Sequence, residues 1–252
     1  MNTRPSGTRN AEQIPTTTHH GSPASGMRTA CRDLSTPSQI PSSRGRPPDP
    51  ERRARILHAA AELFLDHGFA HTSMDRIAQA AGVSKQTVYA HFHSKEDLYR
   101  AVIAHKIAEY FPEESVLAGS SQDSERALAQ FGCRFLALVL SDDSIAMLRR
   151  LIESAERERK LVHLFDEEGP ERILAELTTF CARGCCAVIE GRCRPRGLAE
   201  LLTSLLLGPY LLRRLLGLIA MPPAAELDRH ARLCARQTMI LAEHGLVATG
   251  DR

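Results

Sequence analysis

Four of the seven cysteines lie close together late in the chain, and thiols at this density can bind a metal ion or sense oxidants. They are Cys181, Cys185, Cys186 and Cys193. Cys181 and Cys185 share a helical face, and three arginines between positions 183 and 194 would stabilise thiolates. There is no C-x-x-C pair and no nearby histidine, so buried cysteines in an alanine-like helix are favoured, and we expect no metal.

The other signatures of catalysis are absent from the sequence. We find no spacing of nucleophile, base and orienting group, no phosphate-binding loop and no paired-carboxylate motif. We therefore expect a protein that is not an enzyme, has no catalytic residues and needs no cofactor. A thiol oxidoreductase built around the cysteines is the alternative enzyme class. The odd cysteine count and the lack of a secretory signal favour a reducing cytoplasm over a disulfide framework.

The composition favours helices. Hydrophobic residues make up 43% of the chain and aromatic residues 5%, with no tryptophan, which suits helical bundles better than β-sandwiches. The net charge is +2, yet residues 1–46 carry six arginines against one aspartate and one glutamate. The longest uncharged part of the most apolar stretch, Leu201 to Leu212, is too short to span a bilayer, so we expect no membrane partner.

The chain divides into three parts. Residues 1–49 are rich in proline, serine and threonine and predict a disordered basic tail, in which Met27 is a second candidate for the true start. Residues 50–110 predict a small helical head, and residues 111–248 a larger helical body. We therefore predict an all-α fold, with a three-helix head on a C-terminal bundle that dimerises.

Four helices are predicted in and directly after the head. Apolar residues at three- and four-residue spacing predict the first over about 51–66. Thr72 with Asp75 predicts a cap for a second helix that ends near Gly82. Ser84 and Ser94 predict caps for two more, which end near residues 92 and 111.

The segment from Met74 to Phe92 has the order that a helix-turn-helix needs. Ala78 must be small because the next helix crosses over it, and Gly82 supplies the left-handed backbone of the turn. Ile77, Val83 and Val88 fill the space between the two helices. A generic helical hairpin is the alternative, but polar or small residues leave the outer face of the third helix free of core contacts.

This segment resembles the tetracycline-repressor (TetR/AcrR) family of DNA-binding regulators over about 51–106. Matching residues are Thr87, Tyr89, His91, Phe92 and Lys95, whereas Gln86 stands where the family often has glycine. The body resembles the AefR-like subset through Leu151-Ile-Glu-Ser-Ala-Glu-Arg, Glu168-Gly-Pro-Glu-Arg and Leu205-Leu-Leu-Gly-Pro-Tyr-Leu-Leu.

The resemblance implies that the third helix enters the major groove of duplex DNA. Lys85, Gln86 and Ala90 would then lie nearest the base edges, where lysine suits guanine O6/N7 and glutamine suits adenine N6/N7. Phosphate contacts would come from Thr87, Tyr89, His91 and Lys95, and from Thr72 at the second helix. Tyr89 is expected to have a packing role as well. Arg44 and Arg46 could enter an adjacent minor groove, or belong to a solvated linker.

Five helices are predicted in the body, over 123–140, 144–166, 170–190, 197–219 and 224–243. The apolar belt of 197–219 covers more than one face, so we expect it to form a four-helix dimer interface with 224–243. His163, Arg149 and Tyr210 are weak ligand candidates. We expect a cytoplasmic homodimer. The resemblance implies that the body, residues 111–248, serves ligand binding and dimerisation, and that the protein represses transcription from a palindromic operator on double-stranded DNA until an unidentified small apolar effector releases it. A ligand-binding or scaffold dimer without DNA binding is the alternative.

Overall fold

The computed structural model describes residues 50–112, 124–185 and 194–247, and within these ranges it contains helices and connecting segments but no strand. The expected all-helical class is confirmed. The predicted tail, with Arg44, Arg46 and Met27, lies outside the described residues, as do Cys186 and Cys193. The placement of the domain boundary near residue 110 stays a prediction.

Serine caps start the short helices of the head. The hydroxyls of Ser73, Ser84 and Ser94 each accept a hydrogen bond from the backbone N–H three residues on, which satisfies a donor that the first helical turn leaves open. Two of these caps were predicted; the first helix-turn-helix cap is Ser73 and not Thr72. The helices are α1 (Pro50–His67), α2 (Met74–Ala80), α3 (Lys85–His91) and α4 (Lys95–Tyr110).

The body follows from Ser124. Its elements are α5 (Ser124–Val139), α6 (Asp142–Ser154), α7 (Arg159–Asp166), the π-helical turn η3 (Glu167–Glu171), α8 (Arg172–Arg183), α10 (Pro195–Leu207), α11 (Leu211–Leu215) and α12 (Ala224–Glu243). None of the described helices is both long and apolar enough to cross a membrane.

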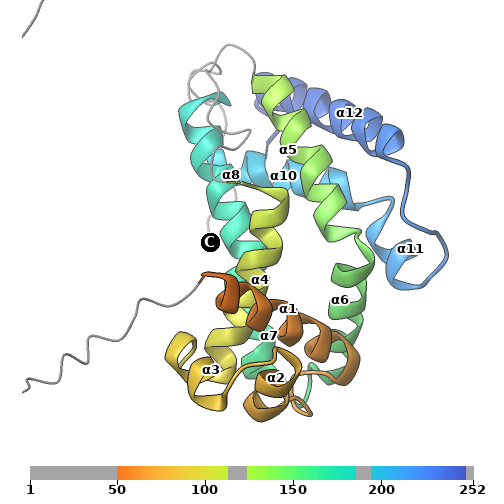
Figure 1. Ribbon diagram of the computed structural model, residues 1–252. Helices are drawn as coiled ribbons and strands as arrows, with labels where there is room; N and C mark the ends of the chain where they lie inside the picture. The colour runs from red at the N-terminus through yellow and green to blue at the C-terminus, as the bar shows by residue number, and fades with distance from the viewer. Residues whose placement is uncertain (1–49, 113–123, 186–193, 248–252) are drawn as a thin grey trace, which may run out of the picture. The chain divides into compact units, whose positions relative to one another are not determined.

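Helix α4 connects the head to the body. It packs against α1 of the head and against α5, α7 and η3 of the body, while α12 packs against α5 and α10 packs against α8 (Figure 1). The buried apolar side chains of both parts form one continuous cluster, from Ile56 in α1 to Val247 after α12. Head and body therefore share a core, and a change in one part can be transmitted to the other by packing.

Gly132 lets α5 approach its neighbours closely. A Cβ atom at this position would lie 3.0 Å from a methyl carbon of Leu206 in α10 and 3.2 Å from the Cβ of Ala231 in α12. Such distances are shorter than ordinary contacts between carbon atoms. A glycine here therefore favours the close packing of three helices.

Two of the predicted body helices are wrong in extent. The helix predicted over 197–219 ends at Leu207, because Pro209 cannot continue the helical hydrogen bonds, and the chain starts again as α11. The helix predicted over 144–166 is two helices, separated by a turn at residues 155–158. The apolar belt is thus divided between α10 and α11, which pack against different partners.

The break predicted at Gly169-Pro170 is also wrong. Helix α7 passes through η3 directly into α8, and Pro170 lies inside the wider turn of the π-helical segment. Proline lacks an N–H group, so it fits where the regular pattern of i→i−4 bonds is interrupted.

Arg214 attaches α11 to the junction between α5 and α6. Its guanidinium donates two hydrogen bonds to the carbonyl oxygen of Leu140, at 2.8 and 3.2 Å, and one to a carboxylate oxygen of Asp142 at 2.7 Å. The side chain of Arg214 is 8% exposed, whereas that of Asp142 is 90% exposed. This arginine is therefore a structural residue of the body.

Candidate nucleic-acid interface

The inner face of α3 is packed against the rest of the head. Val88 of α3 and Ile77 of α2 are fully buried, and Ala78 is nearly so, as the sequence predicted. Gly82 has a φ of +63°, the left-handed conformation expected for the turn between the two helices. Phe92 at the end of α3 is buried, and the guanidinium of Arg53 in α1 lies 5.3 Å from its ring centroid. The helix is thus held rigidly by one face.

The opposite face of α3 is exposed. Lys85, Gln86, Tyr89 and Ala90 all lie on the surface, and Tyr89 is 42% exposed although it is aromatic. Their spacing places them on one side of the helix, away from Val88. The structure therefore brings Lys85, Gln86 and Ala90, which the resemblance assigned to base contacts, together with Tyr89 in one exposed strip, the polar strip.

Lys85 is held in place by an ion pair across the turn. Its ammonium lies 2.8 Å from a carboxylate oxygen of Asp75 in α2, and 6.0 Å from the ring centroid of Tyr89. The hydrogen bond and charge of Asp75 raise the pKa of Lys85 above its ordinary value. The ion pair therefore favours the charged form of the lysine beside the tyrosine, although Asp75 competes for it with any bound anion.

Thr72 is not part of this strip. It is 2% exposed, and its hydroxyl lies 2.8 Å from the carbonyl oxygen of Gly68 and 3.1 Å from that of Leu63, to which it donates. The hydroxyl thus ends α1 and fixes the start of the segment to α2. This structure corrects the expectation of a phosphate contact from the Thr72 side chain, which is committed to the interior.

Lys95 holds the same segment from the other side. Its ammonium donates hydrogen bonds to the carbonyl oxygens of Phe69, at 2.7 Å, and Thr72, at 2.9 Å, and lies 4.2 Å from the centroid of the Phe69 ring. Burial lowers the pKa of Lys95. Two of its three N–H groups are committed to these carbonyls, so only one is left for a phosphate.

The remaining predicted phosphate contacts lie beside the strip. Thr87 and Ser84 share a hydrogen bond of 2.8 Å between their hydroxyls, and His91 is half-buried with its ring 6.2 Å from that of Phe92. Sequence reasoning missed Arg53. This residue of α1 is exposed, and its guanidinium lies at the C-terminal end of α3. The signal available in the sequence was the run of arginines at 52, 53 and 55.

Two of the three weak ligand candidates have structural partners. Arg149 donates to the carbonyl oxygens of Arg214 and Leu215, Tyr210 donates to Glu226 at 3.0 Å, and His163 is exposed. Among the residues that the structure describes, no three histidine, cysteine, aspartate or glutamate side chains gather to hold a metal ion.

Cys181 and Cys185 do lie together, as their spacing predicted. Both are fully buried, and a hydrogen bond from Cys181 lowers the pKa of Cys185, with a further contribution from Ser124. Burial acts in the opposite direction on the same thiol. Their burial keeps both sulfurs from direct contact with solvent.

Two family profiles match the chain, one for each part. Residues 56–102 match the profile of bacterial regulatory proteins of the tetR family, and residues 126–242 match that of the C-terminal domain of AefR-like transcriptional repressors. The first match contains the whole of α2 and α3, and the second extends from α5 into α12.

Individual relatives agree with the profiles. The transcriptional activator FasR of Mycolicibacterium smegmatis is 52% identical over 56 residues, which are 22% of this chain and 26% of FasR. The regulator UidR of Escherichia coli is 34% identical over 117 residues, which are 46% of this chain and 51% of UidR. The solved structure of the flavonoid-responsive regulator FrrA is 30% identical, with a TM-score of 0.56, and the match covers 75% of this chain and 95% of FrrA.

Proposed function

Because this chain belongs to the TetR family of DNA-binding transcriptional regulators, we propose that it is a dimeric, cytoplasmic repressor that leaves a palindromic operator when a small aromatic or apolar effector binds. The family consists of transcription factors and not of enzymes.

The observation that carries the proposal is the exposed outer face of α3. A helix that is anchored by Val88 on one side and offers Lys85, Gln86 and Tyr89 on the other fits the major groove of duplex DNA. Lys85 and Gln86 would read base edges with Ala90 beside them, while Tyr89, Thr87, His91 and Arg53 would contact phosphates. Lys95 would add its remaining donor.

Repression is supported by the body. The profile that matches residues 126–242 describes repressors, whereas the similarity to the activator FasR covers only 56 residues. A repressor acts when operator binding blocks a promoter, so the position of the operator decides the outcome.

Dimerisation is supported by the outer face of α12. Leu233 is 53% exposed and Ile240 is 45% exposed, and they are seven positions apart, so they lie on one side of the helix. Burial of these side chains against a second copy would remove apolar surface from water. A two-fold dimer would place its two α3 helices about one turn of DNA apart, which requires a palindromic site.

The proposal is tested by retention of genomic DNA fragments on the purified chain at low salt, followed by affinity measurements on the retained sequence. We expect Lys85→Ala and Tyr89→Ala each to weaken binding by about tenfold or more. Lys160→Ala is the control, because Lys160 is an exposed lysine on α7 that pairs with Glu96 of α4, so the variant removes a surface cation without changing α2 or α3. It should change the affinity little.

Unchanged retention by Lys85→Ala and Tyr89→Ala, or equal losses with Lys160→Ala, would reject the assignment. A reporter gene placed behind the retained sequence then tests the direction of regulation. Repression requires that expression rises when the gene for this chain is removed.

A further inference from the structure

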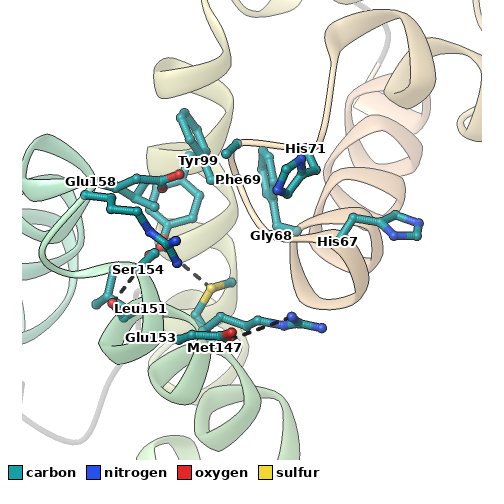
Figure 2. Close-up of a pocket in the computed structure, with 15 residues that line it drawn as sticks. His67, Gly68, Phe69, His71, Tyr99, Met147, Leu151, Glu153, Ser154 and Glu158 are labelled. Atoms are coloured by element: carbon teal, nitrogen blue, oxygen red, sulfur yellow. Dashed lines mark hydrogen bonds and ion pairs between the residues drawn. The ribbon is translucent and has the colours of Figure 1, made fainter.

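A cavity of about 340 Å³ lies where the head meets the body. Its walls come from the end of α1 and the segment that follows, from α4, and from α6 with the turn before α7. Figure 2 shows Phe69 and His71 on the side of the head, Tyr99 from α4, and Met147, Leu151 and Ser154 from α6. The volume is at the lower end of the range of about 300–1,000 Å³ that is usual for small-molecule sites.

The inner wall of the cavity is aromatic. The rings of Phe64, Phe69 and Tyr99 touch one another, with centroids 5.4 to 5.6 Å apart, and Tyr99 meets both phenylalanines edge to face. Phe64 and Tyr99 are each 1% exposed. Phe69 is only partly buried, so a flat aromatic molecule would extend this cluster through that ring, because rings attract one another in offset and edge-to-face arrangements.

Within the described part of the chain, the hydroxyl of Tyr99 has a weak acceptor. The partner that the structure gives it is the sulfur of Met147, 3.6 Å away, and both residues line the cavity. A thioether is a weak acceptor, whereas a buried hydroxyl ordinarily has an oxygen or nitrogen partner. Burial and the charge of Glu158 raise the pKa of Tyr99, so the hydroxyl stays protonated and can donate.

The charges at the cavity favour a neutral occupant. Glu153 and Glu158 line it together with Arg150 and Arg157, so neither sign prevails. A carboxylate that approached the Tyr99 hydroxyl would also be repelled by Glu158, and burying a charge without a partner is unfavourable.

We propose that this cavity binds a neutral, planar aromatic compound with an oxygen atom that accepts a hydrogen bond from Tyr99, and that the bound compound alters how α6 packs on the head. The second half of this statement rests on the proposed function. The first half concerns ligand binding alone.

Arg150 links ligand binding in the cavity to the packing of α6 on the head. From α6 its guanidinium donates hydrogen bonds to the carbonyl oxygens of Leu65, at 3.2 Å, and Asp66, at 2.9 Å, at the C-terminal end of α1. The same side chain lines the cavity. An occupant that shifts α6 therefore acts on a direct contact with the head, and a change in head position alters the fit to two grooves of DNA.

The test uses three probes on the purified full chain, with binding measured by probe fluorescence and by calorimetry. 2-Naphthol is flat and neutral at pH 7 and has an oxygen acceptor; naphthalene lacks the oxygen, and 2-naphthoate is charged. We expect 2-naphthol to bind, naphthalene to bind more weakly, and 2-naphthoate to bind weakest.

Tyr99→Phe removes only the hydroxyl. It should weaken 2-naphthol by about fivefold to tenfold, the usual effect of one hydrogen bond, and leave naphthalene unchanged. Tyr110→Phe, a tyrosine of the same helix that does not line the cavity, is the matched control. Ser154→Phe fills the cavity and should abolish binding of both neutral probes, with thermal unfolding showing that the variant is folded.

Equal binding of 2-naphthol to the wild type, Tyr99→Phe and Ser154→Phe would overturn the site, and tighter binding of 2-naphthoate would overturn its chemistry. A second measurement follows the affinity for the retained operator with and without saturating 2-naphthol. If the affinity for DNA is the same with and without bound 2-naphthol, only the proposed coupling between the cavity and the head is refuted. A chain that binds the probe and no DNA would refute the proposed function but not the site.

Discussion

Replacement of Lys95 by methionine tests whether this lysine is chiefly a structural residue of the head. Methionine keeps most of the side-chain length and removes the ammonium. The change removes two hydrogen bonds from a charged donor to the carbonyls of Phe69 and Thr72, each of about 1.5–3 kcal/mol, and a cation–π contact of about 0.5–1 kcal/mol. Part of this is recovered, because the ammonium no longer has to be desolvated and the two carbonyls can bind water.

We expect Lys95→Met to lower the free energy of unfolding by about 2 kcal/mol. The assay is urea unfolding followed by circular dichroism, which should show a lower midpoint and an unchanged slope. Lys85→Met is the matched control. It removes an ammonium whose side chain is 58% exposed, so its midpoint should stay close to that of the wild type.

The salt dependence of operator binding separates the two roles of Lys95. If Lys95 mainly positions the segment between α1 and α2, the variant binds more weakly while the slope of log affinity against log salt is nearly kept. Loss of a phosphate contact would reduce the magnitude of that slope by about one. An unchanged unfolding midpoint together with a reduced slope would refute the reasoning from the structure, and would show that the ammonium serves DNA and not the carbonyls.

Three further substitutions test the packing. Gly82→Ala should lower the unfolding free energy by about 1–2 kcal/mol, because φ is +63°; the added methyl group meets no neighbouring atom, so the cost is backbone strain alone, and an unchanged urea midpoint would contradict this. Gly132→Ala should cost about 1 kcal/mol net, since the clash with Leu206 exceeds the gain in helix propensity, and a rise in thermal midpoint would show that the helices move apart freely. Arg214→Met should cost about 2–4 kcal/mol by leaving the carbonyl of Leu140 without its charged donors, and calorimetry showing wild-type stability would argue against this role.

The sequence was sufficient for the local features of the head. The caps at Ser84 and Ser94 and the left-handed turn at Gly82 were predicted because each depends on residues within three or four positions. The outer face of α3 was predicted for the same reason, since helical spacing alone separates Lys85, Gln86 and Tyr89 from Val88. The bounds of α12, expected at 224–243, follow from two prolines before an uninterrupted helical pattern.

The sequence was misleading where a polar side chain forms hydrogen bonds with residues distant along the chain. Thr72 and Lys95 are residue types that often bind phosphate. In the structure the Thr72 hydroxyl and the Lys95 ammonium instead donate hydrogen bonds to backbone carbonyl oxygens of residues between Leu63 and Thr72. The helix likewise continues through Pro170 because residues 167–171 form a π-helical turn that packs on α4. The local rule that proline ends a helix takes no account of this packing.

Sequence by itself thus determined the helical class, the helix-turn-helix and the polar strip on α3, because periodicity and capping act over a single turn of helix. Only the tertiary structure decided which polar groups remain free, where the apolar belt divides, and that Tyr99, Met147 and Phe69 surround one cavity. These outcomes depend on contacts between residues tens of positions apart, and the free energy of such contacts is set by burial and close packing that no local pattern records.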